Sequence, residues 1–331
     1  MKIRTLGSTN LRVSPVGLGL AALGRPGYIN LGHADDLDED YAVEAMQGHA
    51  HQVLDAAFQA GIRYFDAARS YGRAEEFLGS WLRSRGIDPK SVTVGSKWGY
   101  TYTAGWKVEA EKHEVKEHSL AVLQRQWQES QNFIGDYLGL YQIHSATLES
   151  GVLENQPVLE ELTRLKSEGT CIGLTLSGAN QSEVLDRALT ITLRGQRLFD
   201  TVQVTWNLLE RSTSSVLQAA HDEGMGVIVK EALANGRLTD RNQDPDFMGQ
   251  KEMLARQAER LNTSIDGLAL AVVLDQPWVS IVLSGAATDG QIHSNAKALD
   301  VKLDQEALDQ ISSLVELPEV YWAKRSALAW N

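Results

Sequence analysis

A glycine, a short apolar run and an aspartate follow one another in Gly61–Ile62–Arg63–Tyr64–Phe65–Asp66. Glycine is common where a helix stops, and a short apolar run next to a turn signal is typical of a buried strand. The preceding residues, Val53–Ala60, have apolar positions at helical spacing. This part of the chain therefore predicts a helix, a strand at Ile62–Phe65, and a carboxylate at the end of that strand.

The same alternation continues along the chain in both directions. Strands are predicted at Val16–Leu20, Ile62–Phe65, Val92–Ser96, Tyr137–Ile143, Ile172–Leu176, Thr201–Val204, Val227–Val229 and Val279–Leu283. Helices are predicted at Val53–Ala60, Ala74–Arg85, Val115–Phe133, Val158–Ser167, Val184–Leu193, Val216–Glu223, Glu252–Leu261, Ser264–Leu274 and Ile292–Leu299. Parallel strands joined by helices require right-handed crossovers, and eight such units close into a (β/α)8 TIM barrel.

The alternative architecture is an open doubly wound sheet. That fold favours a glycine-rich fingerprint after its first strand, and Gly17–Leu18–Gly19 lacks the third glycine at the required spacing. We therefore expect residues 1–331 to form one barrel domain, since barrels of this length are common as single units. Met1–Ser14 predicts an N-terminal β-hairpin that plugs the barrel, and Asp304–Val315 predicts an extra C-terminal helix. The segment Arg25–Gln47 is expected to be a long loop on the active-site face.

The charge, the cysteine content and the lengths of the apolar segments argue against several classes of ligand and partner. The chain has 331 residues, a formal net charge of −12 and no basic stripe, which argues against nucleic-acid binding. Its one cysteine, Cys171, rules out an intramolecular disulfide and a cysteine-based zinc site. No apolar segment approaches the roughly 20 residues of a membrane span, and the N-terminus does not resemble a signal peptide. We expect a cytoplasmic protein without a membrane or nucleic-acid partner; the oligomeric state is left open.

Four titratable residues fall at or just after neighbouring strand ends: Asp66, Tyr71, Lys97 and His144. Active sites in this architecture lie at the carboxyl ends of the strands. A lysine beside a phenol lowers the pKa of tyrosine from its ordinary value of about 10. A carboxylate would hold that lysine in place, and a histidine would hydrogen-bond a substrate oxygen. This set predicts a proton donor, and hydride from a nicotinamide is the natural second reactant.

Two other functions are alternatives to a carbonyl oxidoreductase. A non-catalytic nicotinamide-nucleotide sensor would bind the same cofactor but would have no need of Tyr71. A metal-dependent barrel hydrolase would need a cluster of ligands. The pair His49 and His51 opens a helix, and no convincing partners follow it, so we predict no metal site.

The residues around this set resemble the aldo-keto reductase family. The resemblance is carried by Gly61–Gly72 with its Asp66 and Tyr71, by the Lys97 and His144 strands, and by the opening Arg4–Ser14. It extends over about residues 1–300. It implies NAD(P)H-dependent reduction of aldehydes or ketones to alcohols, or the reverse oxidation of an alcohol or sugar. The natural substrate, a small carbonyl or alcohol compound, and the physiological direction are left open.

The resemblance also implies a set of cofactor-binding residues. Thr175 and Gln203 match positions that contact the nicotinamide carboxamide, although Leu176 stands where the family often has asparagine. Lys230 stands where many members stack an aromatic side chain on the nicotinamide. The remaining positions belong to the pyrophosphate loop and the adenosine-phosphate loop, and they are Leu233, Ser284, Gly285, Ala286, Gln291 and Asn295.

The choice between the two nicotinamide dinucleotides rests on one loop. The family most often uses NADP(H) and holds its 2′-phosphate with cations near the last barrel helix. Here Gly285–Gln291 contains no cation, so a substitute contact from Lys297 or Arg237 would be needed. The resemblance favours NADP(H) slightly, with weaker discrimination against NAD(H) than is usual in the family.

Overall fold

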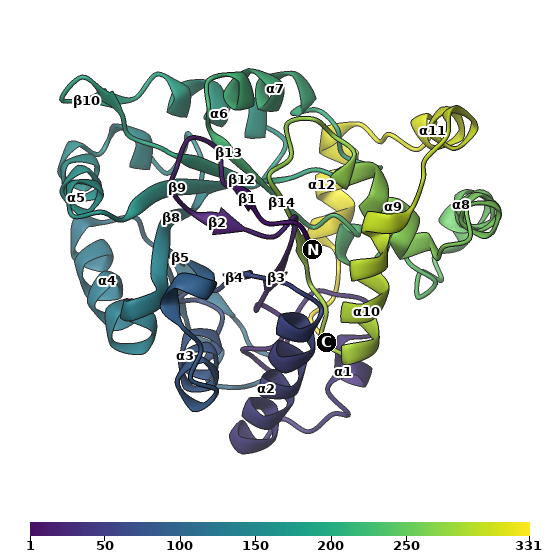
Figure 1. Cartoon of the computed structure of the whole chain (residues 1–331), viewed down its shortest axis with the longest axis horizontal. Coiled ribbons are helices and arrows are strands. Elements are labelled where there is room, and N and C mark those ends of the chain that lie inside the picture. The colour runs from purple at the N-terminus through teal and green to yellow at the C-terminus, as the bar shows by residue number, and fades with distance from the viewer.

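A closed barrel of eight parallel strands forms the centre of the computed structural model, which describes all 331 residues (Figure 1). Strand β14 pairs with β3 to close the barrel. Because all neighbouring pairs are parallel, the carboxyl ends of the strands meet at one rim. The predicted (β/α)8 barrel is confirmed. Its strands are β3 (Val16–Gly19), β4 (Tyr64–Asp66), β5 (Thr93–Trp98), β8 (Leu138–Ala146), β9 (Cys171–Leu176), β12 (Thr201–Thr205), β13 (Gly226–Lys230) and β14 (Ile281–Ser284).

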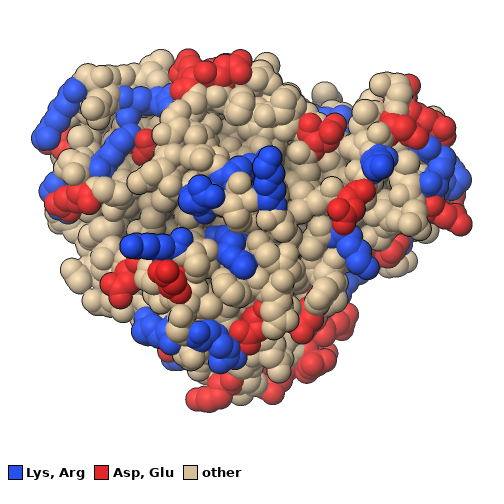
Figure 2. Space-filling view, in the orientation of Figure 1, with Lys and Arg blue, Asp and Glu red and all other residues tan.

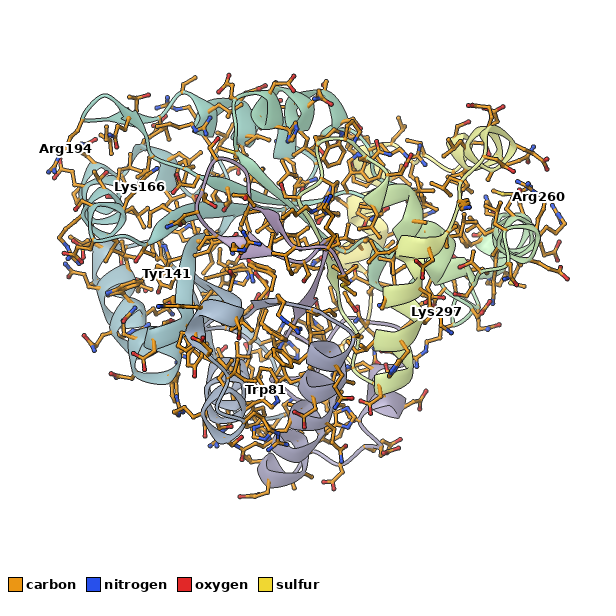
Figure 3. All side chains as sticks on the ribbon, viewed as in Figure 1. Trp81, Tyr141, Lys166, Arg194, Arg260 and Lys297 are labelled. Carbon is orange, nitrogen blue, oxygen red and sulfur yellow. The ribbon has the colours of Figure 1, made fainter.

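Helices between the strands surround the barrel (Figure 1). In α3, Trp81 is fully buried and its ring lies 5.3 Å from that of Phe65 on β4, so the apolar face of this helix packs on the barrel (Figure 3). The outer helices are α2 (Val43–Gln59), α3 (Ala74–Ser84), α4 (Leu120–Ile134), α5 (Gln156–Ser167), α6 (Gln181–Leu189), α7 (Ser214–Asp222), α8 (Met248–Arg260), α9 (Ile265–Leu274) and α10 (Asp289–Lys297).

The N-terminal hairpin covers the end of the barrel opposite the active-site rim. It consists of β1 (Arg4–Thr5) and β2 (Arg12–Val13), as predicted. Leu6 is fully buried and belongs to the same apolar cluster as Tyr64 and Ile228 of the barrel strands. Gly7 has φ +54° and approaches the backbone of Gly226 so closely that a β-carbon there would meet its nitrogen at 2.3 Å. A side chain at this position would therefore lift the hairpin off the barrel.

Several segments differ from the sequence prediction, among them α2, which begins at Val43 and not at Val53. The hairpin β6 (Tyr100–Tyr102) and β7 (Glu114–Lys116) occupies a region expected to be loop and the start of a helix. Helix α4 accordingly begins only at Leu120, where Ser119 accepts a hydrogen bond from the Val122 amide. The long loop after β3 contains the short helix α1 (His33–Asp36). The C-terminal region holds α11 (Gln305–Ser312), as predicted, and also α12 (Pro318–Ser326), which was not predicted.

The face drawn in Figure 2 is the hairpin side of the barrel. Lys and Arg side chains gather near its centre, where the hairpin lies, and most Asp and Glu side chains lie toward its edge. The helices contain no stretch that is both long and apolar enough to cross a membrane.

Candidate active site

Asp66 and Lys97 form a buried ion pair between the neighbouring strands β4 and β5. The Lys97 Nζ atom also donates to the Ala67 carbonyl at 2.9 Å and lies 4.8 Å from the centre of the Tyr71 ring. Both charged side chains are almost fully buried, so their attraction is weakly screened. The ammonium group is thereby fixed beside the tyrosine ring.

Two further groups anchor the Asp66 carboxylate. Its Oδ1 atom accepts hydrogen bonds from the Tyr64 hydroxyl at 3.1 Å and from Gln203 Nε2 at 3.0 Å. These side chains come from β4 and from β12 on the far side of the barrel. A buried carboxylate with this many partners has one fixed orientation, so it positions Lys97 accurately.

The side chains of Tyr71 and His144 face each other, close to the Asp66–Lys97 pair. Their ring centres are 5.5 Å apart and the rings are almost perpendicular, at 84°. Tyr71 lies in the loop after β4, in a tight turn that continues through Gly72. Gly72 has φ +60°, and a β-carbon there would lie 2.4 Å from the Gly24 carbonyl oxygen. The turn that presents Tyr71 therefore depends on a glycine at position 72.

The charge states of these two residues follow from burial. Burial, together with the charge of Asp66, raises the pKa of Tyr71 above its ordinary value, while Arg25 opposes the rise. Burial and the nearby cations Lys97 and Lys230 hold the pKa of His144 well below its ordinary value. At neutral pH the site therefore contains a protonated phenol and a neutral imidazole. The sequence predicts that Lys97 lowers the pKa of Tyr71. In the structure this pKa is raised, because burial has the largest effect on it.

A cavity of about 610 Å³ opens at the carboxyl rim of the barrel. Asp66, Tyr71 and His144 line it, whereas Lys97 lies beneath Asp66 and does not. The same cavity extends along the predicted cofactor positions. Those that line it are Gln203, Lys230, Leu233, Ser284, Gly285, Ala286, Gln291 and Asn295. Asp66, Tyr71, Lys97 and His144 form a tetrad, and one continuous space joins three of its members to the start of α10.

Thr175 is the predicted site residue that the structure places elsewhere. Its side chain is fully buried, it does not line the cavity, and its hydroxyl accepts a hydrogen bond from the Ser145 amide at 2.8 Å. It holds the backbone that follows His144 on β8. Thr175 therefore acts on the site through that strand and does not face the cavity.

The start of α10 is held in place by side-chain hydrogen bonds. Thr288 accepts a hydrogen bond from the Gln291 amide, and Gln291 Oε1 accepts one from the Ala287 amide. Asn295 Nδ2 donates to the Ser284 hydroxyl at 2.8 Å, which ties the helix to the end of β14. Gly285 carries no side chain, so the loop backbone is open to the cavity. Helix N-termini with accessible amides are favourable places for phosphate.

A buried charge cluster occupies the end of β13. Lys230 donates to the hydroxyls of Ser177 and Thr205, at 3.2 and 2.7 Å, and burial lowers its pKa to about 8. Burial would raise the pKa of Glu231, but Arg325 and Lys230 outweigh it and lower that pKa to about 2. Arg325 Nη2 donates to Glu231 at 2.6 Å. The unpredicted helix α12 thus contributes a charge to the cavity.

The loop after β3 and the C-terminal segment cover the Tyr71 side of the cavity. Arg25 is buried, donates to the Ser70 carbonyl at 3.1 Å, and its guanidinium lies 5.3 Å from the centre of the Tyr71 ring. Trp330 lies under the same guanidinium, 4.9 Å away. The Tyr28 and Asn331 backbones exchange two hydrogen bonds of 3.1 Å each. Sequence reasoning missed these contacts because no local pattern joins residues 300 positions apart.

No group of three or more His, Cys, Asp or Glu side chains is arranged to hold a metal ion. The two histidines that invited a metal interpretation point to other partners. His49 Nε2 lies 2.5 Å from the Ala287 carbonyl oxygen, and His51 Nε2 lies 2.7 Å from the Ser80 hydroxyl. Both therefore join α2 to its neighbours.

Comparison with known proteins gives a consistent result over almost the whole chain. The model of the Aldo/keto reductase family matches residues 15–316. The oxidoreductase YqkF of Bacillus subtilis, itself uncharacterized, is 26% identical over 98% of this chain and 100% of its own length. The L-galactose dehydrogenase of Arabidopsis thaliana is 26% identical over 96% and 95% of the two chains. Among solved structures, the holo form of aldo-keto reductase AKR11C1 from Bacillus halodurans has a TM-score of 0.72 and 22% identity, and the match covers 96% and 97% of the two chains.

Proposed function

Because the chain belongs to the aldo/keto reductase family, we propose that this oxidoreductase interconverts a small carbonyl compound and its alcohol with Tyr71 as the proton donor and acceptor. One observation carries the proposal. The Tyr71 ring lies against the buried Lys97–Asp66 pair and faces His144 at the floor of a cavity of about 610 Å³. A nicotinamide dinucleotide, when bound, supplies the hydride.

The residues present fit such a cofactor. The cavity runs from the tetrad to the N-terminus of α10, whose amides suit a phosphate. Ser284, Gly285, Gln291 and Asn295 would hold the adenosine end. Gln203 and Lys230 lie closer to the tetrad, where they would contact the nicotinamide end.

Side chains of the protein itself would carry out the proton transfer. Since its pKa is raised, Tyr71 keeps its proton at neutral pH and can donate it to the oxygen of the carbonyl group as that group is reduced. His144 is neutral and its Nδ1 atom lies 3.4 Å from the Ser70 hydroxyl, so Nε2 is left to hold the carbonyl oxygen. Lys97 and Asp66 act from beneath and fix the phenol. In the alcohol-oxidising direction the same groups work in reverse, with Tyr71 as the base.

The test is a panel of aldehydes, ketones and alcohols assayed with reduced or oxidised nicotinamide dinucleotides and followed by the absorbance of the reduced ring. Turnover with at least one class of carbonyl or alcohol is expected. Tight dinucleotide binding without turnover on any member of the panel would instead favour the sensor function. Absence of dinucleotide binding would overturn the proposal altogether.

A further inference from the structure

The part of the cavity next to Gln291 is acidic. Asp36, Asp240, Asp266 and Arg241 line it, and Lys251, which does not line it, donates to the Asp240 carbonyl at 2.6 Å. The lining residues come from three separate segments: α1, the loop before α8, and the start of α9. The Asp266 carboxylate accepts a hydrogen bond from the Ser294 hydroxyl on α10 at 2.8 Å, which keeps it against that helix. The predicted adenosine end therefore carries more negative than positive charge.

Asp36 lies at the centre of this region and is held from two sides. Arg241 Nη1 and Nη2 donate to its two carboxylate oxygens at 2.7 and 2.5 Å. Gln291 Nε2 donates to the same two oxygens at 3.0 and 3.1 Å. The Asp36 side chain is only 8% exposed. A carboxylate thus occupies the hydrogen-bond donors of Gln291, a residue predicted to contact the adenosine phosphate.

Arg241 is held by Asp36 and by the backbone of the loop after β3. Besides Asp36, its Nη1 atom donates to the carbonyls of Leu31 and Gly32, at 3.1 Å each. The two substitute cations considered from the sequence are also out of reach. Arg237 is paired with Glu316 at 2.6 Å and does not line the cavity. Lys297 is on the exposed side of α10 and does not line it either (Figure 3).

We propose that Asp36 makes this enzyme select NAD(H) over NADP(H), an inference that rests on the function proposed above. A 2′-phosphate carries nearly two negative charges. Placed near Gln291, it would meet the Asp36 carboxylate, which already offsets the charge of Arg241. A free ribose 2′-hydroxyl can instead donate to a carboxylate, as it does to the acidic residue of NAD-specific sites in other folds. Selectivity here comes mainly from a repulsive group.

This inference differs from the family resemblance, which favours NADP(H). The difference has a physical source. The sequence shows that the loop after β14 lacks a cation, but it does not show that α1 brings a carboxylate to the same place. That information exists only once the loop after β3 is folded against α10 and the β13–α8 loop.

The test is equilibrium titration of the whole protein with NADH and NADPH, followed by quenching of tryptophan fluorescence. The wild-type protein should bind NADH at least tenfold more tightly than NADPH. Asp36→Asn keeps the size of the side chain, removes its charge and frees Arg241, so it should tighten NADPH binding by tenfold or more while NADH changes by less than threefold. Asp35→Asn is the matched control, because Asp35 is exposed on the same short helix and does not line the cavity. Its ratio of affinities should stay within twofold of wild type.

Three results would overturn the inference. The wild-type protein could bind NADPH as tightly as NADH, Asp36→Asn could leave the ratio unchanged, or Asp35→Asn could shift the ratio as much as Asp36→Asn. If neither dinucleotide binds, the proposed function itself fails, and that outcome is distinct from all three.

Discussion

Lys97 lies between Asp66 and Tyr71: its ammonium group is paired with the carboxylate and lies 4.8 Å from the centre of the tyrosine ring. The pair is almost completely buried, so each charge depends on the other. Removing one partner of a buried pair leaves an unpaired charge in a medium of low polarisability. Lys97 is therefore expected to matter both for the stability of the fold and for proton transfer by Tyr71.

Replacing Lys97 with methionine should destabilise the protein by about 3–5 kcal/mol, because Asp66 would be left buried and unpaired. Urea unfolding measures the free energy of unfolding. The double variant Asp66→Asn/Lys97→Met removes both charges and should recover part of the loss. If the single variant is as stable as wild type, the pair does not have the energetic role that its burial implies.

The rate of carbonyl reduction should be independent of pH from about 6.5 to 10. The His144 pKa is below its ordinary value of 6.5 and the Tyr71 pKa is above its ordinary value of 10.0, so neither group titrates in this range. The measurement is kcat/KM for reduction as a function of pH. Two other cavity groups could titrate there: Lys230, whose pKa is lowered to about 8, and Lys116, whose pKa is lowered by burial. A decline near pH 8 that persists in both Lys230→Met and Lys116→Met would show that the Tyr71 pKa is lowered after all.

Arg25→Met should reduce the turnover number by about 10- to 10²-fold, the usual effect of a small misplacement of a reacting group. Arg25 holds the Ser70 carbonyl next to Tyr71 and is the cation that opposes the rise in the Tyr71 pKa. Steady-state kinetics should show the loss mainly in kcat, with dinucleotide affinity almost unchanged. Arg73→Met is the control, since Arg73 is half-exposed and lies outside the cavity. Equal losses in both variants would mean that the effect is not specific to Arg25.

The tetrad could be predicted from sequence because each member lies at or next to a strand end, and parallel strands in a barrel bring such ends together. The alternation of helices and strands was sufficient for the barrel itself. Asp36, Arg25 and Arg325 could not be predicted in the same way. They come from a long loop and from α12, whose places are set by contacts with residues more than 40 positions away, such as Ser70, Arg241 and Glu231.

Thr175 was predicted as a cofactor ligand, but the structure does not place it at the cavity. Its position in β9 matches the pattern expected of a cofactor ligand, but its hydroxyl is used to hold the Ser145 amide. The sequence of a strand indicates which residues point toward the barrel interior. It does not indicate at which of these residues the cavity begins. The β6–β7 hairpin was missed for a related reason, since its short strands are only partly buried and have no strong apolar alternation.

The central claim is that Tyr71 donates the proton, and the most direct test is Tyr71→Phe assayed under single-turnover conditions with a carbonyl substrate found in the panel. The variant keeps the ring and removes only the hydroxyl. The rate of reduction should fall by about 10²–10⁴-fold, while dinucleotide binding persists, because the adenosine end of the cavity is untouched. Tyr137→Phe is the control, as the Tyr137 hydroxyl bonds the Ile87 carbonyl outside the cavity. A Tyr71→Phe enzyme that reduces carbonyls at close to the wild-type rate would contradict the account.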